Sequence, residues 1–307
     1  MYGIIFVVGL VGNITALVVY LVKIRPFNSS SIIMVNLAIA DLLYVLSLPF
    51  LVHFYFTDKW EFGDIMCRLV RSCFHLNLYG SILLLTVLSV FRYVVVVYPL
   101  KAELVNKPSY GIISCLAVWL LCLFLIYPMY SLFEPGDDSK AICLDFASHK
   151  GVGVYGCILT IFGFLIPLFV VCLSYSCVAR ALSRGLLPQR PAHLQARRLA
   201  VVTLLVFVVC FTPYHFLRLA RMDTRRRTVS CVMEVGVNAV YTISRPLAGF
   251  NTLFNLALYT LAGDRFHQAF RSLLHWNGCP LHSVSPRSLV TSVYRPRSWS
   301  CDDLVQN

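Results

Sequence analysis

Charged residues are scarce in this chain. Asp, Glu, Lys and Arg together make up 13% of its 307 residues, whereas hydrophobic residues make up 58% and the mean hydropathy is +0.75. A soluble domain usually has about 25% charged residues, so this chain has too few polar side chains to cover a water-soluble globule. Long apolar runs and 13% aromatic residues also exclude a disordered chain, which is polar and highly charged. Both exclusions leave a membrane protein as the class that fits.

Acidic residues are the scarcer charged type. Asp and Glu number 14 against 26 Lys and Arg, which gives a net charge of +12. The sequence has no soluble basic domain that would hold nucleic acid, so the surplus indicates anionic lipid headgroups, an anionic ligand or an acidic cytosolic partner. It also lacks CxxC pairs, Cys/His clusters, nucleophile–base pairs and a glycine-rich phosphate loop. We therefore expect neither an enzyme nor a zinc protein.

Seven apolar stretches are long enough to cross a bilayer as helices, because such a helix needs about 20 mostly apolar residues. They cover Tyr2–Val22, Ser31–Phe54, Ile65–Tyr98, Ser109–Leu132, Val152–Leu182, Arg197–Ala220 and Met233–Ala262. A helix satisfies its own backbone polar groups, and the runs are too long and continuous for the alternation of a β-barrel. The sequence predicts an all-α membrane protein, a seven-helix bundle over residues 1–262.

The residues after the last span have a different character. Residues 263–279 are predicted to form an amphipathic helix on the membrane surface, with an apolar face made of Phe266, Phe270, Leu273 and Leu274. Residues 280–307 are rich in Ser, Arg and Pro, which indicates a disordered cytoplasmic tail. Lys and Arg are more numerous in the odd-numbered loops, so we expect those loops inside the cell and the N-terminus outside the plasma membrane.

Cationic and titratable side chains gather near the predicted outer ends of three spans. They are Arg71, His75, His215, Arg218 and Arg245. One arginine alone is equally well explained as snorkelling to the headgroups, and either histidine as a hydrogen-bonded packing residue. Three arginines at similar depth without an acidic neighbour instead favour an anion that relieves their repulsion. The sequence therefore predicts a site for an anionic ligand, with the outer cluster Arg221–Arg227 steering anions toward it.

An ordered set of short motifs resembles the rhodopsin-like G-protein-coupled receptors over essentially the whole length. The matching segments are Gly12-Asn13, Asn36 to Asp41, Arg92-Tyr93, Trp119, and Pro167 with Ile82 and Phe207. This resemblance implies a receptor that couples to a heterotrimeric G protein through Arg92, Tyr93, Tyr175 and Tyr259. It also implies a disulfide between Cys67 and Cys143.

Three positions depart from the family pattern. Phe91 stands where the family usually has the Asp that restrains Arg92, and Phe211 stands where it commonly has Trp. Leu256 replaces the proline of the last span. These changes put the restraint on Arg92 and the kink of the last span in doubt, but not the receptor class.

Within that family the chain is similar to the purinergic-like group. His215-Phe216-Leu217-Arg218 matches its His-x-x-Arg pattern, and residues 74–79, 91–93, 196–199 and 244–248 are most similar to the branch of 2-oxoglutarate receptors. The resemblance implies a small dicarboxylate such as 2-oxoglutarate, held by Arg71, His75, Arg218 and Arg245, and coupling to the Gq class. A nucleotide receptor remains an alternative. So does an ion-coupled transporter, although the repeats and discontinuous helices common in transporters are not evident.

Asp41 lies in the middle of the second span, at the depth of Asn13, Ser81, Asn251 and Asn255. Two explanations of this polar group stay open. The resemblance implies a sodium ion at Asp41, Ser81 and Asn251, where it would act as an allosteric modulator. A protonated or water-satisfied carboxylate explains the same residues without an ion.

Overall fold

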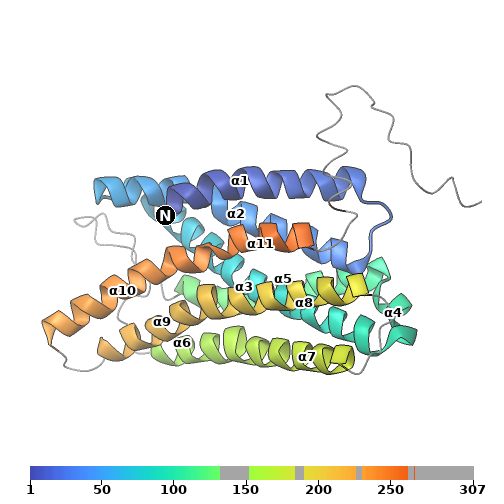
Figure 1. Cartoon of the computed structure of the whole chain (residues 1–307). Coiled ribbons are helices and arrows are strands. Elements are labelled where there is room, and N and C mark those ends of the chain that lie inside the picture. The colour runs from blue at the N-terminus through green and yellow to red at the C-terminus, as the bar shows by residue number, and fades with distance from the viewer. Residues whose placement is uncertain (132–151, 184–189, 226–229, 262–265, 267–307) are drawn as a thin grey trace, which may run out of the picture. The chain divides into compact units, whose positions relative to one another are not determined.

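The computed structural model describes residues 1–131, 152–183, 190–225 and 230–261, together with Phe266. Every secondary-structure element in these ranges is a helix (Figure 1). Within the same ranges, six helices are long and apolar enough to cross a membrane. Inside a bilayer a helix bonds its own backbone groups, so these helices agree with the all-α class that the sequence predicts.

The first six predicted spans each correspond to one helix or to consecutive helices. The elements are α1 (Tyr2–Val18) with η1 (Val19–Lys23), α2 (Ser29–Thr57), α3 (Gly63–Val97), α5 (Pro108–Ser131), α6 (Val152–Thr160) with η2 (Ile161–Leu165) and α7 (Ile166–Ser183), and α8 (Arg190–Leu205) with η3 (Val206–Phe211) and α9 (Thr212–Thr224). A short helix, α4 (Pro99–Val105), lies between α3 and α5. The largest difference is in the sixth span, which begins at Arg190 rather than Arg197.

Helix α3 is the element around which much of the bundle packs. It contacts α2, α5 and α7, and also reaches η2 and α10. Its buried residues run from Cys67 to Ser89, through most of the helix. Elsewhere large apolar side chains face outward, such as Phe124 on α5 at 76% exposure and Phe169 on α7 at 64%. Apolar surface on this scale is rare in soluble monomers and suits contact with lipid.

Two spans are interrupted by π-helical segments close to a proline. Segment η2 precedes Pro167, and η3 precedes Pro213. Proline has no N–H, so it leaves a carbonyl of the preceding turn without its helical partner. The hydroxyl of Thr212, the first residue of α9, donates to the carbonyl of Phe207 in η3 at 2.9 Å. Helices change direction at such breaks. Segment η2 separates α6 from α7, and η3 separates α9 from α8, so α6 and α9, which carry part of the candidate site, can be angled independently of α7 and α8.

The seventh predicted span, Met233–Ala262, is found as two helices, α10 (Cys231–Gly249) and α11 (Asn251–Leu261). The sequence left a kink in doubt because Leu256 replaces the family proline, yet the span breaks earlier, at Phe250. The N–H of Phe250 bonds to the carbonyls of Pro246 and Leu247 at 3.0 and 3.1 Å, which tightens the turn. Pro246 lies inside α10, four residues before this break, and Leu256 lies beyond it in α11.

Several predicted features lie outside the described residues: nearly all of the amphipathic helix at 263–279, the tail at 280–307, and Cys143. Phe266 is described, and its buried ring lies 5.5 Å from that of Tyr20 in η1. Cys67, in the first turns of α3, is disulfide-bonded. Its pairing with Cys143 stays a prediction.

Candidate functional site

The residues predicted to form the ligand site are buried toward the end of the bundle where α3 begins, here called the Cys67 end. Arg71 and His75 come from α3, His215 and Arg218 from α9, and Arg245 from α10. Their exposed fractions are 2% for Arg71, 1% for Arg218, 7% for Arg245 and 0% for both histidines. Buried guanidinium groups are costly unless they are hydrogen-bonded or meet an anion, so the partners of each one decide its role.

Arg218 is hydrogen-bonded by the protein itself. One terminal nitrogen donates to the hydroxyl of Tyr79 at 2.6 Å. The other donates to the hydroxyl of Thr160 at 2.9 Å and to the carbonyl of Gly156 at 3.4 Å. These partners belong to α3 and α6, so Arg218 connects three helices. All three are neutral oxygens, which satisfy the donors without neutralising the positive charge.

Aromatic rings connect Arg218 to Arg245. The guanidinium carbon of Arg245 lies 5.5 Å from the ring centre of Phe74, and that of Arg218 lies 5.5 Å from the ring centre of Tyr214. The rings of Phe74 and Tyr214 are 5.4 Å apart, and that of Tyr241 follows at 5.8 Å. Cations are attracted to ring faces at such distances. This row of three rings, here called the aromatic layer, therefore holds the two arginines at neighbouring positions.

The two histidines have different surroundings. His75 Nδ1 lies 2.9 Å from the carbonyl of Arg71, one turn earlier on α3, and its Nε2 lies 3.4 Å from the hydroxyl of Tyr214. His75 therefore connects α3 to the aromatic layer. His215 instead stacks on Phe164 of η2, with ring centres 4.4 Å apart and planes 9° from parallel. Its Nδ1 also lies 3.3 Å from a terminal nitrogen of Arg218, so His215 both packs on η2 and contacts a predicted site residue.

The predicted steering cluster begins at the edge of this site. Arg221 lies 4.6 Å from the ring centre of Tyr241, so it extends the aromatic layer. The Arg225 side chain is exposed overall. Its pKa is lowered by the removal of part of the guanidinium from water and by the charge of Arg221, and it is raised by Glu234 and Tyr241. Arg226 and Arg227 lie outside the described residues. Both arginines therefore lie near Tyr241, and Arg221 makes the cation–ring contact with it.

Sequence reasoning missed the tyrosines of this site. Tyr79 follows His75 by one helical turn, and Tyr241 precedes Arg245 by one turn. Each therefore shares a helix face with a predicted site residue, and this spacing would have identified both. Thr160 offered no such signal, because it reaches Arg218 from a different span.

Asp41 forms a hydrogen-bonded centre between spans. It is 0% exposed, and one carboxylate oxygen accepts from the amide of Asn77 at 2.7 Å. The other accepts from the amide of Asn255 at 2.9 Å and from the hydroxyl of Tyr259 at 3.5 Å. Tyr259 also donates to Asn13 at 3.2 Å. The carboxylate thereby connects α2, α3 and α11, and Tyr259 connects them to α1.

The residues around Asp41 fit a hard cation in part. Hard cations take oxygen ligands, and within the described structure the buried Ser81 Oγ and Asn255 Oδ1 have no hydrogen-bond partner. Both atoms have free acceptor capacity. Asn251 is also buried, and its side-chain oxygen accepts only from the hydroxyl of Thr252 at 3.4 Å among the hydrogen bonds of the described residues, so this oxygen too has acceptor capacity for a cation. Asp41, Ser81 and Asn251 therefore all offer oxygen donors, Asn255 offers a further one, and sodium at this position stays a prediction.

The far end of α3, here called the Arg92 end, carries the predicted coupling residues. Arg92 is half-buried and within electrostatic range of Tyr175 on α7 and Tyr20 in η1. The hydroxyl of Tyr175 donates to the hydroxyl of Thr203 on α8 at 3.2 Å, and both side chains are buried. The structure therefore brings Tyr175 near Arg92 while bonding it to the sixth span.

The other two predicted coupling residues have separate partners. The hydroxyl of Tyr93 lies 3.4 Å from that of Tyr98 at the end of α3. The hydroxyl of Tyr259 is directed to Asp41 and Asn13, within the hydrogen-bonded centre around Asp41. The four residues predicted for coupling are therefore divided between the Arg92 end and the Asp41 centre in this arrangement.

Comparisons with known proteins identify the family. Residues 12–259 match the model of the 7 transmembrane receptor (rhodopsin family). The chain is 42% identical over 276 residues to 2-oxoglutarate receptor 1 of Rattus norvegicus, covering 88% of this chain and 82% of that protein. It is 36% identical over 287 residues to succinate receptor 1 of Rattus norvegicus, covering 89% and 88%. It is also 36% identical over 276 residues to P2Y purinoceptor 1 of Homo sapiens, covering 87% and 74%.

Proposed function

The chain belongs to the rhodopsin family of seven-transmembrane receptors, and on that premise we propose that it is a receptor for a small dicarboxylate such as 2-oxoglutarate. Membership makes it a multi-pass membrane receptor rather than an enzyme, with a small-molecule ligand and a G protein as partners. The match also favours a receptor over an ion-coupled transporter. The proposal adds the chemical class of the ligand and the residues that hold it.

The observation that carries the proposal is the pair of buried guanidinium groups on one aromatic layer. Arg218 and Arg245 contact neighbouring rings of that layer, and the buried Arg71 precedes Phe74 by one turn of α3. Arginine binds a carboxylate through two parallel hydrogen bonds and stays charged at any physiological pH. A dicarboxylate brings two such acceptors, so one small ligand would connect α3, α9 and α10.

Two relatives support the same ligand class, since they are named as receptors for 2-oxoglutarate and for succinate. The similarity to P2Y purinoceptor 1 supports a nucleotide as the second candidate, because phosphates would meet the same cations. The balance favours the dicarboxylate, because the higher identity is to the 2-oxoglutarate receptor and the aromatic layer leaves its cations close together.

Activation follows from how α9 continues toward the Arg92 end. A ligand that binds one packing of α3, α9 and α10 better than another shifts the receptor toward that packing. Helix α9 continues through Pro213 and η3 into α8, where Thr203 accepts the hydrogen bond of Tyr175. Movement of α8 would release Tyr175 and open the surface around Arg92 and Tyr93 to a G protein of the Gq class.

We also propose how the receptor is oriented in the membrane and that it binds a sodium ion. The Cys67 end faces outward from the plasma membrane with the N-terminus, and the Arg92 end faces the cytosol. A sodium ion held by Asp41, Ser81 and Asn251, with Asn255 as a further oxygen donor, modulates the receptor allosterically. Its oxygen donors and their free acceptor capacity support this assignment.

A calcium-mobilisation screen tests the proposed ligand class. Cells that express the receptor are given 2-oxoglutarate, succinate, a monocarboxylate of the same length and a panel of nucleotides, with untransfected cells as the control. We expect a response to the dicarboxylates that the monocarboxylate does not reproduce, because one carboxylate engages only part of the cation set. A response to nucleotides alone would transfer the assignment to the second candidate.

A further inference from the structure

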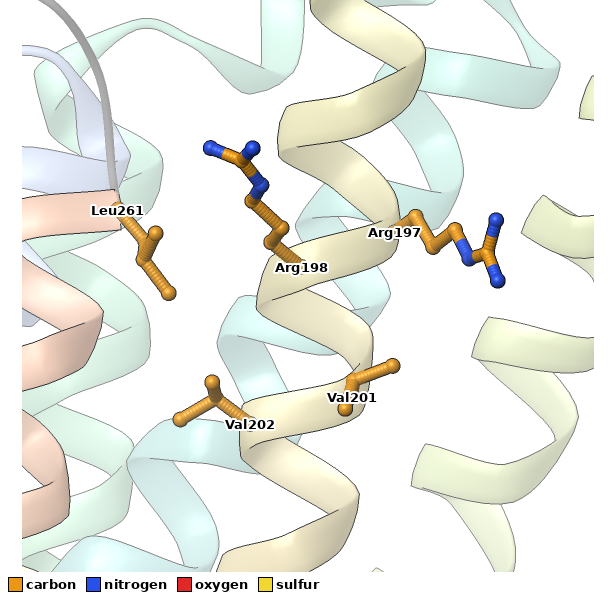
Figure 2. Close-up of a pocket in the computed structure, with 5 residues that line it drawn as sticks. All are labelled: Arg197, Arg198, Val201, Val202 and Leu261. Carbon is orange, nitrogen blue, oxygen red and sulfur yellow. The ribbon is translucent and has the colours of Figure 1, made fainter.

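A pocket opens between the sixth and seventh spans at the Arg92 end, away from the proposed ligand site. Its volume is about 440 Å³, and it is lined by Arg197, Arg198, Val201, Val202 and Leu261 (Figure 2). The first four residues come from α8 and the last from the end of α11. Apart from the two arginines the lining is wholly apolar.

The charged and apolar residues of this pocket are arranged in columns along α8. Val201 and Val202 follow Arg197 and Arg198 by four residues, so each valine lies one turn from an arginine on the same helix face. Figure 2 shows Arg198 and Val202 pointing toward Leu261, with Arg197 on the opposite side of the helix. Helix α8 begins at Arg190, but the apolar stretch able to cross a membrane begins at Gln195, so the arginines lie in the first turn of that stretch and the valines lie deeper in it. The pocket therefore has a charged part at the two arginines and an apolar part at the valines and Leu261, which suits a molecule with an anionic headgroup and a hydrocarbon chain.

The charges of this pocket are not balanced within it. Both arginines are exposed. Among the lining residues that the structure describes, none is acidic. Beside the pocket, the amide of Gln195 donates to the carbonyl of Leu261 at 3.2 Å, which holds α8 against α11. The pocket therefore presents two positive groups to an anion from outside the chain.

We infer that this pocket binds an anionic membrane phospholipid whose headgroup carries additional phosphate groups. The headgroup lies at the arginines and an acyl chain lies along Val202 and Leu261. Basic pockets between spans on the cytoplasmic side of a membrane bind such headgroups, and the inference rests on the proposed orientation of the receptor. A bilayer lipid fits better than a soluble anion, because Val201, Val202 and Leu261 offer a chain an apolar surface that a free phosphate would leave unused.

The test uses the purified full chain in phosphatidylcholine nanodiscs and a fluorescent dioctanoyl phosphatidylinositol bisphosphate as the probe. Unlabelled probe lipid should compete for the site, whereas dioctanoyl phosphatidylcholine and the soluble inositol trisphosphate headgroup should compete at least about tenfold less well. Competition by phosphatidylcholine at equal strength would show only general lipid contact. Competition by the soluble headgroup at equal strength would show a free-phosphate site. Either result would overturn the inference.

Variants separate the two parts of the pocket. Loss of each arginine should weaken binding roughly fivefold, so Arg197→Gln with Arg198→Gln should weaken it at least about tenfold. The control Arg180→Gln, at the exposed end of α7, should change it less than about twofold. Filling the apolar floor with Val202→Trp should also weaken binding, whereas Val208→Trp, at a lipid-facing position with 59% exposure, should not.

Each variant is checked for an unchanged unfolding temperature before binding is compared. If the arginine variants keep full affinity for the lipid and lose only G-protein activation, Arg197 and Arg198 belong to the surface that contacts the G protein. That result would overturn the lipid site and leave the proposed receptor function intact. The two claims therefore fail separately.

Discussion

Single buried polar residues in this receptor differ in where their partners come from. Arg218 finds its hydrogen-bond acceptors inside the protein, on Tyr79, Thr160 and Gly156. Ser81 Oγ is buried without a partner in the described structure. A buried donor left without a partner costs about 1–3 kcal/mol. Bonded groups of this kind stabilise one packing, and unbonded ones are candidates for an ion, a water or a ligand.

Thr203 offers a prediction at this scale. Thr203→Val keeps the shape of the side chain but removes the hydroxyl that accepts from Tyr175. Loss of one such hydrogen bond costs roughly 1 kcal/mol, about a fivefold change in a two-state population. We expect ligand-independent signalling to rise severalfold at matched surface expression, measured as basal inositol phosphate. Thr203→Ser, which keeps the hydroxyl, is the control, and equal basal activity in both variants would contradict the role of this contact.

Phe91 offers a second prediction. It stands directly before Arg92, which lies within electrostatic range of Tyr175 and Tyr20 but has no acidic neighbour in sequence at that position. Phe91→Asp should give Arg92 a local ion pair in the resting arrangement, so basal signalling should fall. Phe91→Asn, which is polar but uncharged, should lower it less. A rise in basal signalling with Phe91→Asp at equal surface expression would refute this account of Arg92.

At the scale of elements, the contact between α3 and η2 positions the ligand site. A Cβ atom added to Gly163 in η2 would lie 2.6 Å from Cε1 of Tyr79. The Tyr79 ring cannot easily yield, because its hydroxyl accepts from Arg218 at 2.6 Å. Glycine is therefore required at this position for the fifth span to approach α3.

Gly163→Ala should disturb this contact and the arginine that depends on it. Overpacking a well-packed interior costs roughly 1–3 kcal/mol, so we expect a lower unfolding temperature of the purified receptor together with a weaker response to 2-oxoglutarate. Gly236→Ala is the matched control, because an added Cβ there has nothing within 4 Å and α10 gains a better helix former. An unfolding temperature equal to wild type for Gly163→Ala would show that η2 can move away from Tyr79 without cost.

For the whole molecule, composition and span length predicted the fold well. Six of the predicted spans appear as helices able to cross a membrane within the described residues, and the seventh is present as α10 and α11. The break at Phe250 was not predicted, because it depends on how Pro246 and Leu247 arrange their carbonyls rather than on one motif residue. Hydrophobic run length determines where a helix crosses, but it carries little information about where that helix is interrupted.

The charged residues of the candidate site were predictable from the sequence, but the residues that accept their hydrogen bonds were not. Arg71, Arg218 and Arg245 stand out in a sequence because arginine inside a span is costly. The acceptor that Thr160 provides to Arg218 lies 58 residues away along the chain, and only the packing of α6 against α9 brings the two together. The sequence treated the three arginines as equivalent. Their surroundings distinguish Arg218, which connects helices, from Arg245, whose guanidinium lies over Phe74.

This distinction selects the variants for the central claim. Arg218→Ala would leave Tyr79 and Thr160 without their donor, so any loss of response would mix folding with binding. Arg245→Ala and Arg71→Ala remove the other two buried guanidinium groups of the site, and the unfolding temperature of each purified variant separates a loss of folding from a loss of binding. Removing one partner of a buried charge pair costs roughly 2–5 kcal/mol in binding, or at least about thirtyfold in affinity. Arg245→Lys should restore part of the loss, because lysine keeps the charge but lacks the planar fork.

The most direct test is the potency of 2-oxoglutarate on cells that express wild type, Arg71→Ala, Arg245→Ala, Arg245→Lys and Arg225→Ala at equal surface levels. We expect at least about a thirtyfold loss of potency for the two alanine variants of the site. We expect a partial loss for Arg245→Lys and a much smaller one for Arg225→Ala, whose side chain is exposed. Unchanged potency in Arg71→Ala and Arg245→Ala, with loss of the response in Arg225→Ala, would contradict the buried dicarboxylate site.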